Sequence, residues 1–176
     1  LFVARRPVAQ ICRSSLLFGS TICFFFGLNY ISVPTASMIN FTAPLIATVL
    51  AIPLLGEKVG PRRLLAVMAG LVGAAIILRP GGEEAHWAMF VGLASATCYA
   101  GYQLLTRWAA GGDNAETAIT YTAVVGTVVT SIALPWFWTT PDGLIDLVMF
   151  IAIGCIGGTG HFFVIRAFQH AEVSII

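Results

Sequence analysis

The residues that could do chemistry in this sequence are polar side chains that recur at helical spacing inside long apolar stretches. One helical face of residues 36–55 carries Ser37, Asn40, Pro44 and Thr48, at positions i, i+3, i+7 and i+11. Pro44 lacks an amide hydrogen, so it leaves a carbonyl without its helical donor about one turn earlier, near Asn40. In lipid such a carbonyl needs a neighbour, a water molecule or a substrate. The pattern indicates either a break that faces a cavity and binds polar groups or a packed kink satisfied by Thr42 or an adjacent helix.

A second polar stripe lies in residues 86–107. Its members on one helical face are Ser95, Tyr99, Tyr102 and Thr106, with Gln103 beside them. Two tyrosines offer flat rings for stacking and hydroxyl groups for hydrogen bonds, which suits a planar or zwitterionic metabolite. Hydroxyl groups also hold packed membrane helices together, at about 0.6 kcal/mol per bond. The stripe predicts either a substrate-binding surface or a helix-packing seam.

Two ionisable side chains lie in the last apolar stretch, residues 143–168. A buried His161 would either titrate near neutral pH and couple transport to protons, or stay neutral and bond a backbone carbonyl. Arg166 is close to one end, and we expect it to extend to the lipid headgroups rather than to bind substrate. No Asp or Glu lies deep in any apolar stretch, so the sequence shows no acidic relay for protons or sodium.

Catalytic and metal-binding patterns are missing from the sequence. It has no HExxH or GxSxG motif and no paired acids within an apolar stretch. The four cysteines are far apart, without metal or disulfide spacing, and we interpret them as small apolar side chains. We therefore expect no cofactor, no metal and no enzyme activity.

The elements that must position these residues are membrane helices. Of 176 residues, 58% are hydrophobic and 10% charged, with a net charge of +1 and a mean hydropathy of +0.90. So few charges cannot cover a water-soluble globule, and there is no basic run for nucleic acid. A spanning helix needs about 20 mainly apolar residues. Six segments qualify: 14–33, 36–55, 62–79, 86–107, 116–138 and 143–168. The sequence predicts an all-α, polytopic transmembrane bundle.

The positive charges predict its orientation. With six crossings, one side receives Arg5, Arg6, Arg13, Lys58, Arg62, Arg63, Arg107 and Arg166. Only Arg79 falls on the other side, so both ends of the chain are expected in the cytoplasm. The charged turn that begins at Glu57 and Lys58 is either a solvated loop that sets this topology or the location of a gating ion pair.

The first and last segments show an internal repeat. Residues 19–25, GSTICFF, match residues 157–163, GGTGHFF, at four of seven positions. Equivalent positions are five segments apart, and an odd number inverts the second copy relative to the first. Inverted repeats recur in secondary transporters, with the substrate site at the repeat interface.

Several motifs in combination resemble the EamA-type carriers of the drug/metabolite transporter superfamily. They are NYISVPTASMI at 29–39, TAPL at 42–45, LGEK at 55–58, GLVGAAIIL at 70–78 and AFQHAEVSII at 167–176. The resemblance implies ten helices in two inverted repeats, of which about six are present. Residues 1–79 would be most of the first repeat, 80–85 the loop between repeats, and 86–176 the first part of the second. We expect an internal part of a longer protein.

These observations favour a secondary transporter that moves small polar metabolites or drugs, such as amino acids and their derivatives, by alternating access. The candidate binding residues are Asn40, Pro44, Tyr99, Tyr102, Gln103 and His161. The alternative is a membrane assembly or regulatory protein without transport activity. The expected setting is a lipid bilayer, and the resemblance implies a bacterial inner membrane. The expected partner is a small-molecule substrate, and a homodimer is an option.

Overall fold

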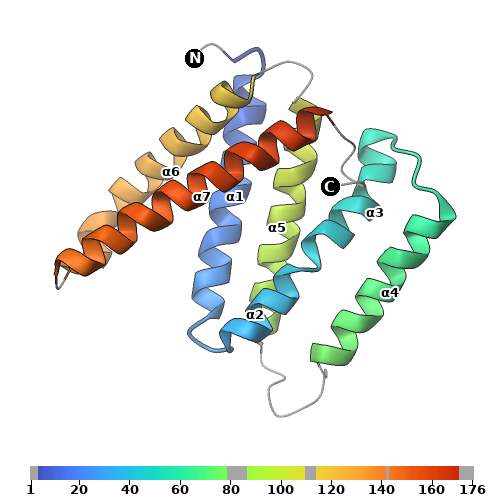
Figure 1. The fold of residues 1–176 in the computed structure, drawn as a ribbon, viewed down its shortest axis with the longest axis horizontal. Helices are drawn as coiled ribbons and strands as arrows, with labels where there is room; N and C mark the ends of the chain where they lie inside the picture. Colours follow the sequence, from blue (N-terminus) through green and yellow to red (C-terminus); the bar gives the residue numbers. More distant parts are fainter. Residues whose placement is uncertain (1–3, 79–86, 110–113, 142, 171–176) are drawn as a thin grey trace.

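The computed structural model describes residues 4–78, 87–109, 114–141 and 143–170, and all regular structure in these ranges is helical. Seven helices follow one another (Figure 1): α1 (Pro7–Gly27), α2 (Val33–Asn40), α3 (Ala43–Leu55), α4 (Pro61–Leu78), α5 (Ala88–Ala109), α6 (Ala115–Phe137) and α7 (Leu144–His170). Because α2 and α3 together form one broken span, the seven helices correspond to the six predicted segments. The prediction of an all-helical membrane bundle is confirmed.

Five of these spans are long and apolar enough to cross a bilayer, among the residues described: Pro7–Gly27, Val33–Leu55, Ala88–Ala109, Ala115–Phe137 and Leu144–His170. The apolar part of α4 is shorter, Leu64–Ile76. The first span begins at Pro7 rather than at the predicted residue 14. Proline is favoured in the first turn of a helix, where its missing N–H is not needed.

Helices α1 and α5 lie side by side at the centre of the bundle (Figure 1). Helices α6 and α7 pack on one side of this pair, and α2, α3 and α4 lie on the other. The seams are built from small residues, since Ala43, Ala47, Ala96 and Ala100 are completely buried. Small side chains let membrane helices approach closely, which is the main source of packing energy between them in lipid.

Helix α1 is apolar on the outside and polar on the inside. Gln10, Arg13, Ser14 and Ser20 are buried, whereas large apolar side chains such as Phe25 (64% exposed) face outward. A soluble helix would show the opposite distribution, because apolar side chains leave water but have no reason to leave lipid. The fold therefore gathers polar side chains along its centre.

The span made by α2 and α3 is interrupted at Phe41 and Thr42. The Thr42 hydroxyl and amide both donate to the Ile39 carbonyl, at 2.6 and 3.0 Å. These bonds satisfy a backbone acceptor at the break, which lipid could not do. Helix α3 then ends at Gly56, whose φ of +69° is a left-handed conformation that glycine adopts without steric cost.

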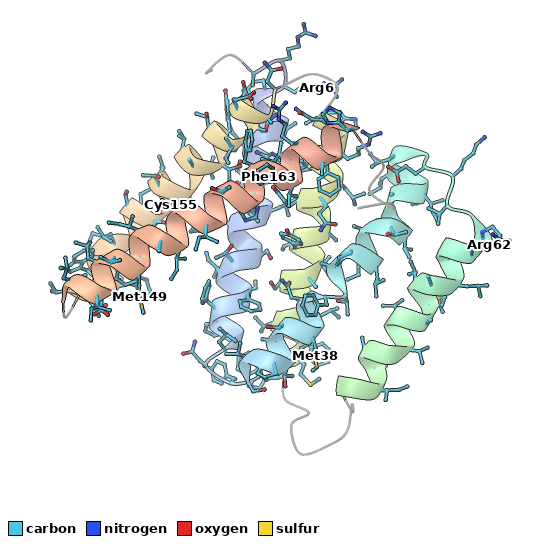
Figure 2. The ribbon with its side chains drawn as sticks, in the orientation of Figure 1. Arg6, Met38, Arg62, Met149, Cys155 and Phe163 are labelled. Carbon is cyan, nitrogen blue, oxygen red and sulfur yellow. The ribbon has the colours of Figure 1, made fainter. Side chains whose placement is uncertain are left out.

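Helix α7 packs on the bundle only through its second half. Residues 147–160 are exposed on every side, and Figure 2 shows the labelled Met149 and Cys155 on this outlying part. The contacts of α7 with the buried centre come later in the helix, where Ile165 and Phe168 are buried.

Candidate functional site

The main polar site surrounds Arg13 of α1, which is completely buried. Its Nε donates to the Gln10 Oε1 at 3.1 Å, and its Nη1 lies 3.5 Å from the Thr106 hydroxyl of α5. Its Nη2 donates to two acceptors on α6, the Ala118 carbonyl and the Thr122 hydroxyl, the latter at 2.7 Å. One guanidinium thus joins α1 to two helices, α5 and α6, whose contacting residues lie about 100 positions further along the chain.

Every partner of this guanidinium in the described part of the chain is neutral. Arg13 lies six residues, or about 9 Å, into α1. An arginine at the centre of a spanning helix costs about 2.5–3.5 kcal/mol or more to insert, and such residues usually pair or line a polar pathway. The hydrogen bonds offset part of this cost, but none of these partners carries a negative charge.

Two aromatic side chains next to Arg13 carry buried polar atoms that have no hydrogen-bond partner in the structure, the Tyr102 hydroxyl and the His161 Nδ1. The Arg13 guanidinium lies 5.3 Å from the centre of the Tyr102 ring, and that ring lies 5.9 Å from the His161 ring, edge to face. An unpartnered buried polar atom usually costs 1–3 kcal/mol. Such a pair beside a buried charge is a group of unsatisfied polar atoms that a ligand could engage.

A small cavity adjoins this cluster. It is lined by Gln10, Arg13, Thr106, Ala109, Ala118, Ile165 and Gln169, with a volume of about 10 Å³. That is room for about one water molecule. The conformation is therefore closed around Arg13, and a larger molecule requires the surrounding helices to separate.

The other predicted site residues are divided between this cluster and a second one. Tyr102 adjoins Arg13, the His161 ring lies against Tyr102, and the Tyr99 ring lies 5.5 Å from that of Tyr102. Gln103 is buried on the same helix, α5. Asn40 belongs to the second cluster, about two helical turns away along α5.

The second cluster joins α1, α2 and α5. The Ser95 hydroxyl lies 3.1 Å from that of Ser20, donates to the Ser20 carbonyl at 2.8 Å, and lies 3.4 Å from the Asn40 Oδ1. The two ends of the polar stripe on α5 thus have different surroundings. Ser95 holds a packing seam together, whereas Tyr102 presents an unpartnered hydroxyl.

Pro44 is exposed at the start of α3 and lies in neither cluster. Near the break, a cleft of about 310 Å³ separates α2 and α3 from α4. It is lined by Met38, Phe41, Thr42, Leu45, Gly70, Gly73 and Ala74. This lining is mostly apolar, so the break faces a surface that suits hydrocarbon better than a polar solute.

An ion pair closes the end of the bundle where α3 and α5 end. The Arg107 Nε lies 3.9 Å from the Glu57 Oε1, and the Arg107 Nη1 donates to the Phe168 carbonyl of α7 at 2.9 Å. This contact connects the turn after α3 with α5 and α7. Arg166, in contrast, is exposed, and its guanidinium lies 5.6 Å from the Phe162 ring.

The sequence interpretation missed Arg13, which it counted among the flanking charges that set topology. Two signals were present. Pro7 is a helix-start residue that places Arg13 inside the span, and the spacing of Gln10, Arg13 and Ser14 puts three polar side chains on one helical face. The partners on α5 and α6 could not be inferred from either signal.

Comparison with known proteins finds sequence similarity to transporters. Residues 8–79 match the model of the EamA-like transporter family. The chain is 28% identical to an S-adenosylmethionine uptake transporter of Rickettsia bellii over 169 residues, which are 96% of this chain and 58% of that protein. It is 29% identical to a riboflavin transporter of Vibrio cholerae over 77% of this chain and 45% of that protein.

A pseudopaline exporter of Pseudomonas aeruginosa is 25% identical over 88% of this chain and 55% of its own length. No solved structure matches the chain. The chain thus spans about half the length of these curated relatives. Residues 8–79, which contain almost all of α1–α4, match the model of the EamA-like transporter family, and nearly the whole chain is similar to the S-adenosylmethionine uptake transporter.

Proposed function

We propose that the protein is a secondary transporter that carries small polar metabolites or drugs, amino acids and their derivatives among them, across the cytoplasmic membrane. It would work by alternating access between two inverted repeats, residues 1–79 and 86–176, joined by residues 80–85. The observation that carries this proposal is the polar cluster at Arg13, which lies within membrane-spanning helices and includes two buried polar atoms without partners.

The candidate binding residues have separate roles in this proposal. Tyr102 and His161 contact the solute at the Arg13 cluster, with Tyr99 as a stacking surface and Gln103 beside them. Asn40 belongs to the seam where α2 meets α5. Pro44 maintains the break between α2 and α3 and does not touch the solute, because its side chain faces outward.

The relatives support transport as the general activity but not one substrate or direction. They are named for the uptake of S-adenosylmethionine, for riboflavin transport and for pseudopaline export. We infer a bacterial inner membrane from the resemblance to EamA-type carriers, and we infer from the distribution of Lys and Arg that both ends of this chain are in the cytoplasm. The proposal includes a homodimer as one arrangement, which the oligomeric state of the purified protein would test.

The experiment is solute counterflow in proteoliposomes that contain the full-length protein, with amino acids, nucleosides, flavins and organic cations as labelled probes. Protein-dependent exchange of at least one probe is expected, while protein-free liposomes show none. If the protein is folded and inserted but exchanges no probe, the transporter proposal is refuted and the alternative of a membrane assembly or regulatory protein is favoured.

A further inference from the structure

We infer that the Arg13 cluster binds the carboxylate of an anionic or zwitterionic substrate, with Arg13 as the anion-binding group and the Tyr102 hydroxyl as a second donor. The inference rests on the proposed transport function and specifies the substrate class. It is carried by charge balance, donor geometry and the two unpartnered polar atoms.

The charge of Arg13 has no counter-ion in the described residues. The acids that the structure describes are Glu57, Glu116 and Asp146, which lie in a turn or in the first turn of a helix. None of the hydrogen bonds of Arg13 goes to a carboxylate. A buried charge is retained only when it is compensated, and an anion that enters the site would compensate the charge of Arg13.

The donors of Arg13 are used unequally. Nε and Nη2 donate at ordinary distances or shorter, whereas the contact of Nη1 with the Thr106 hydroxyl is long, at 3.5 Å. The planar guanidinium fits a carboxylate through two parallel N–H···O bonds, in which Nη1 and Nη2 can both take part. The ring of Tyr102 lies on the same guanidinium, and its free hydroxyl can donate to the second carboxylate oxygen.

Binding would be coupled to movement of α6. The cavity of about 10 Å³ is too small for a carboxylate, and Nη2 is occupied by the Ala118 carbonyl and the Thr122 hydroxyl of α6. A carboxylate is a stronger acceptor than either group. The carboxylate would replace these two acceptors as α6 moves away from α1. An incoming anion would thus break the contact between Arg13 and α6 that keeps the site closed.

The test measures the binding of two matched pairs by the full-length protein in detergent, together with their counterflow in proteoliposomes. One pair is phenylalanine and phenylalaninamide, and the other is S-adenosylmethionine and its decarboxylated form. The members of each pair differ only at the carboxylate, which is an amide in phenylalaninamide and is absent from decarboxylated S-adenosylmethionine. We expect the wild-type protein to bind the carboxylate member of at least one pair tenfold or more tightly than its partner.

Two variants and a control assign this preference to the cluster. Arg13→Gln should abolish it, and Tyr102→Phe should weaken carboxylate binding about five- to tenfold without lowering the melting temperature, because the lost hydroxyl has no partner to lose. Arg62→Gln removes the same charge from an exposed residue at the start of α4 (Figure 2) and should keep the preference.

The outcomes separate this inference from the proposed function. Transport of both members of each pair at equal rates, or of the uncharged and cationic probes alone, would overturn the carboxylate site and leave transport standing. If Arg13→Gln unfolds the protein while Tyr102→Phe keeps wild-type affinity, Arg13 holds the fold together rather than binding a carboxylate, and the inference is wrong. A folded protein that exchanges no probe refutes transport and, with it, this inference.

Discussion

Gly92 of α5 is the position where the smallest possible addition should have the clearest effect. A Cβ built there would lie 3.1 Å from both the Cδ1 and the Cγ2 of Ile39 and 3.5 Å from its Cβ. Ile39 is 2% exposed, and its branched side chain has few alternative rotamers. It therefore cannot give way without moving α2, whose next residue, Asn40, lies against Ser95.

The size of the effect follows from two opposing terms. Alanine is favoured over glycine inside a helix by about 0.5–1 kcal/mol. Overpacking a rigid contact costs about 1–3 kcal/mol. Gly92→Ala should therefore lower the free energy of unfolding by about 0–2.5 kcal/mol, and the melting temperature by about 2–4 °C for each kcal/mol.

The assay is thermal unfolding of the purified protein in detergent, with Gly126→Ala as the matched control. Gly126 lies inside α6, and a Cβ added there would meet nothing within 4 Å beyond the backbone of its own helix, so its substitution should leave stability unchanged or raise it slightly. The reasoning about the α2–α5 contact would be refuted if both alanine variants melted at or above the wild-type temperature.

Three further predictions concern single groups. Thr42→Val removes the hydroxyl that bonds the Ile39 carbonyl at the helix break and should cost about 0.5–1.5 kcal/mol of stability, more than Thr97→Val, which affects only an exposed bond within a regular helix; equal denaturation midpoints would argue against a role at the break. Glu57→Gln should lower stability by about 0.2–1 kcal/mol through the Arg107 pair, and a difference from wild type that did not shrink in high salt would contradict an electrostatic origin. Asn40→Leu and Tyr99→Ala should each reduce counterflow while the protein still folds and inserts, and wild-type flux in either would remove that residue from the candidate site.

The helices were predictable because their signals are local. A run of about 20 apolar residues must form a helix in lipid, where no other unclosed structure satisfies its backbone. Helix α5 was predicted at 86–107 and lies at Ala88–Ala109, and α6 was predicted at 116–138 and lies at Ala115–Phe137. The start of α1 was placed seven residues too late, because a charged residue at position 13 has the hydropathy of a loop.

The composition of the candidate site was only partly predictable. Tyr102 and His161 were selected for their residue types, and the structure places their rings next to each other. Asn40 and Pro44 were selected with them but lie elsewhere, since the break at Phe41 and Thr42 ends the single helical face on which their spacing depended. Periodicity holds only while the helix is continuous.

The sequence by itself determined the all-helical membrane class, the number of spans and the resemblance to a transporter family, because composition, apolar length and short motifs are properties of neighbouring residues. Only the tertiary structure decided that Arg13 is inside the bundle, that Tyr102 adjoins Arg13 and that His161 adjoins Tyr102. Apart from Gln10 on the same helix, the acceptors of Arg13 come from α5 and α6, 93 to 109 residues further along the chain. Whether a polar side chain of a membrane helix faces lipid headgroups or a buried partner depends on which helices pack against it, and that choice is made by side-chain fit between distant segments.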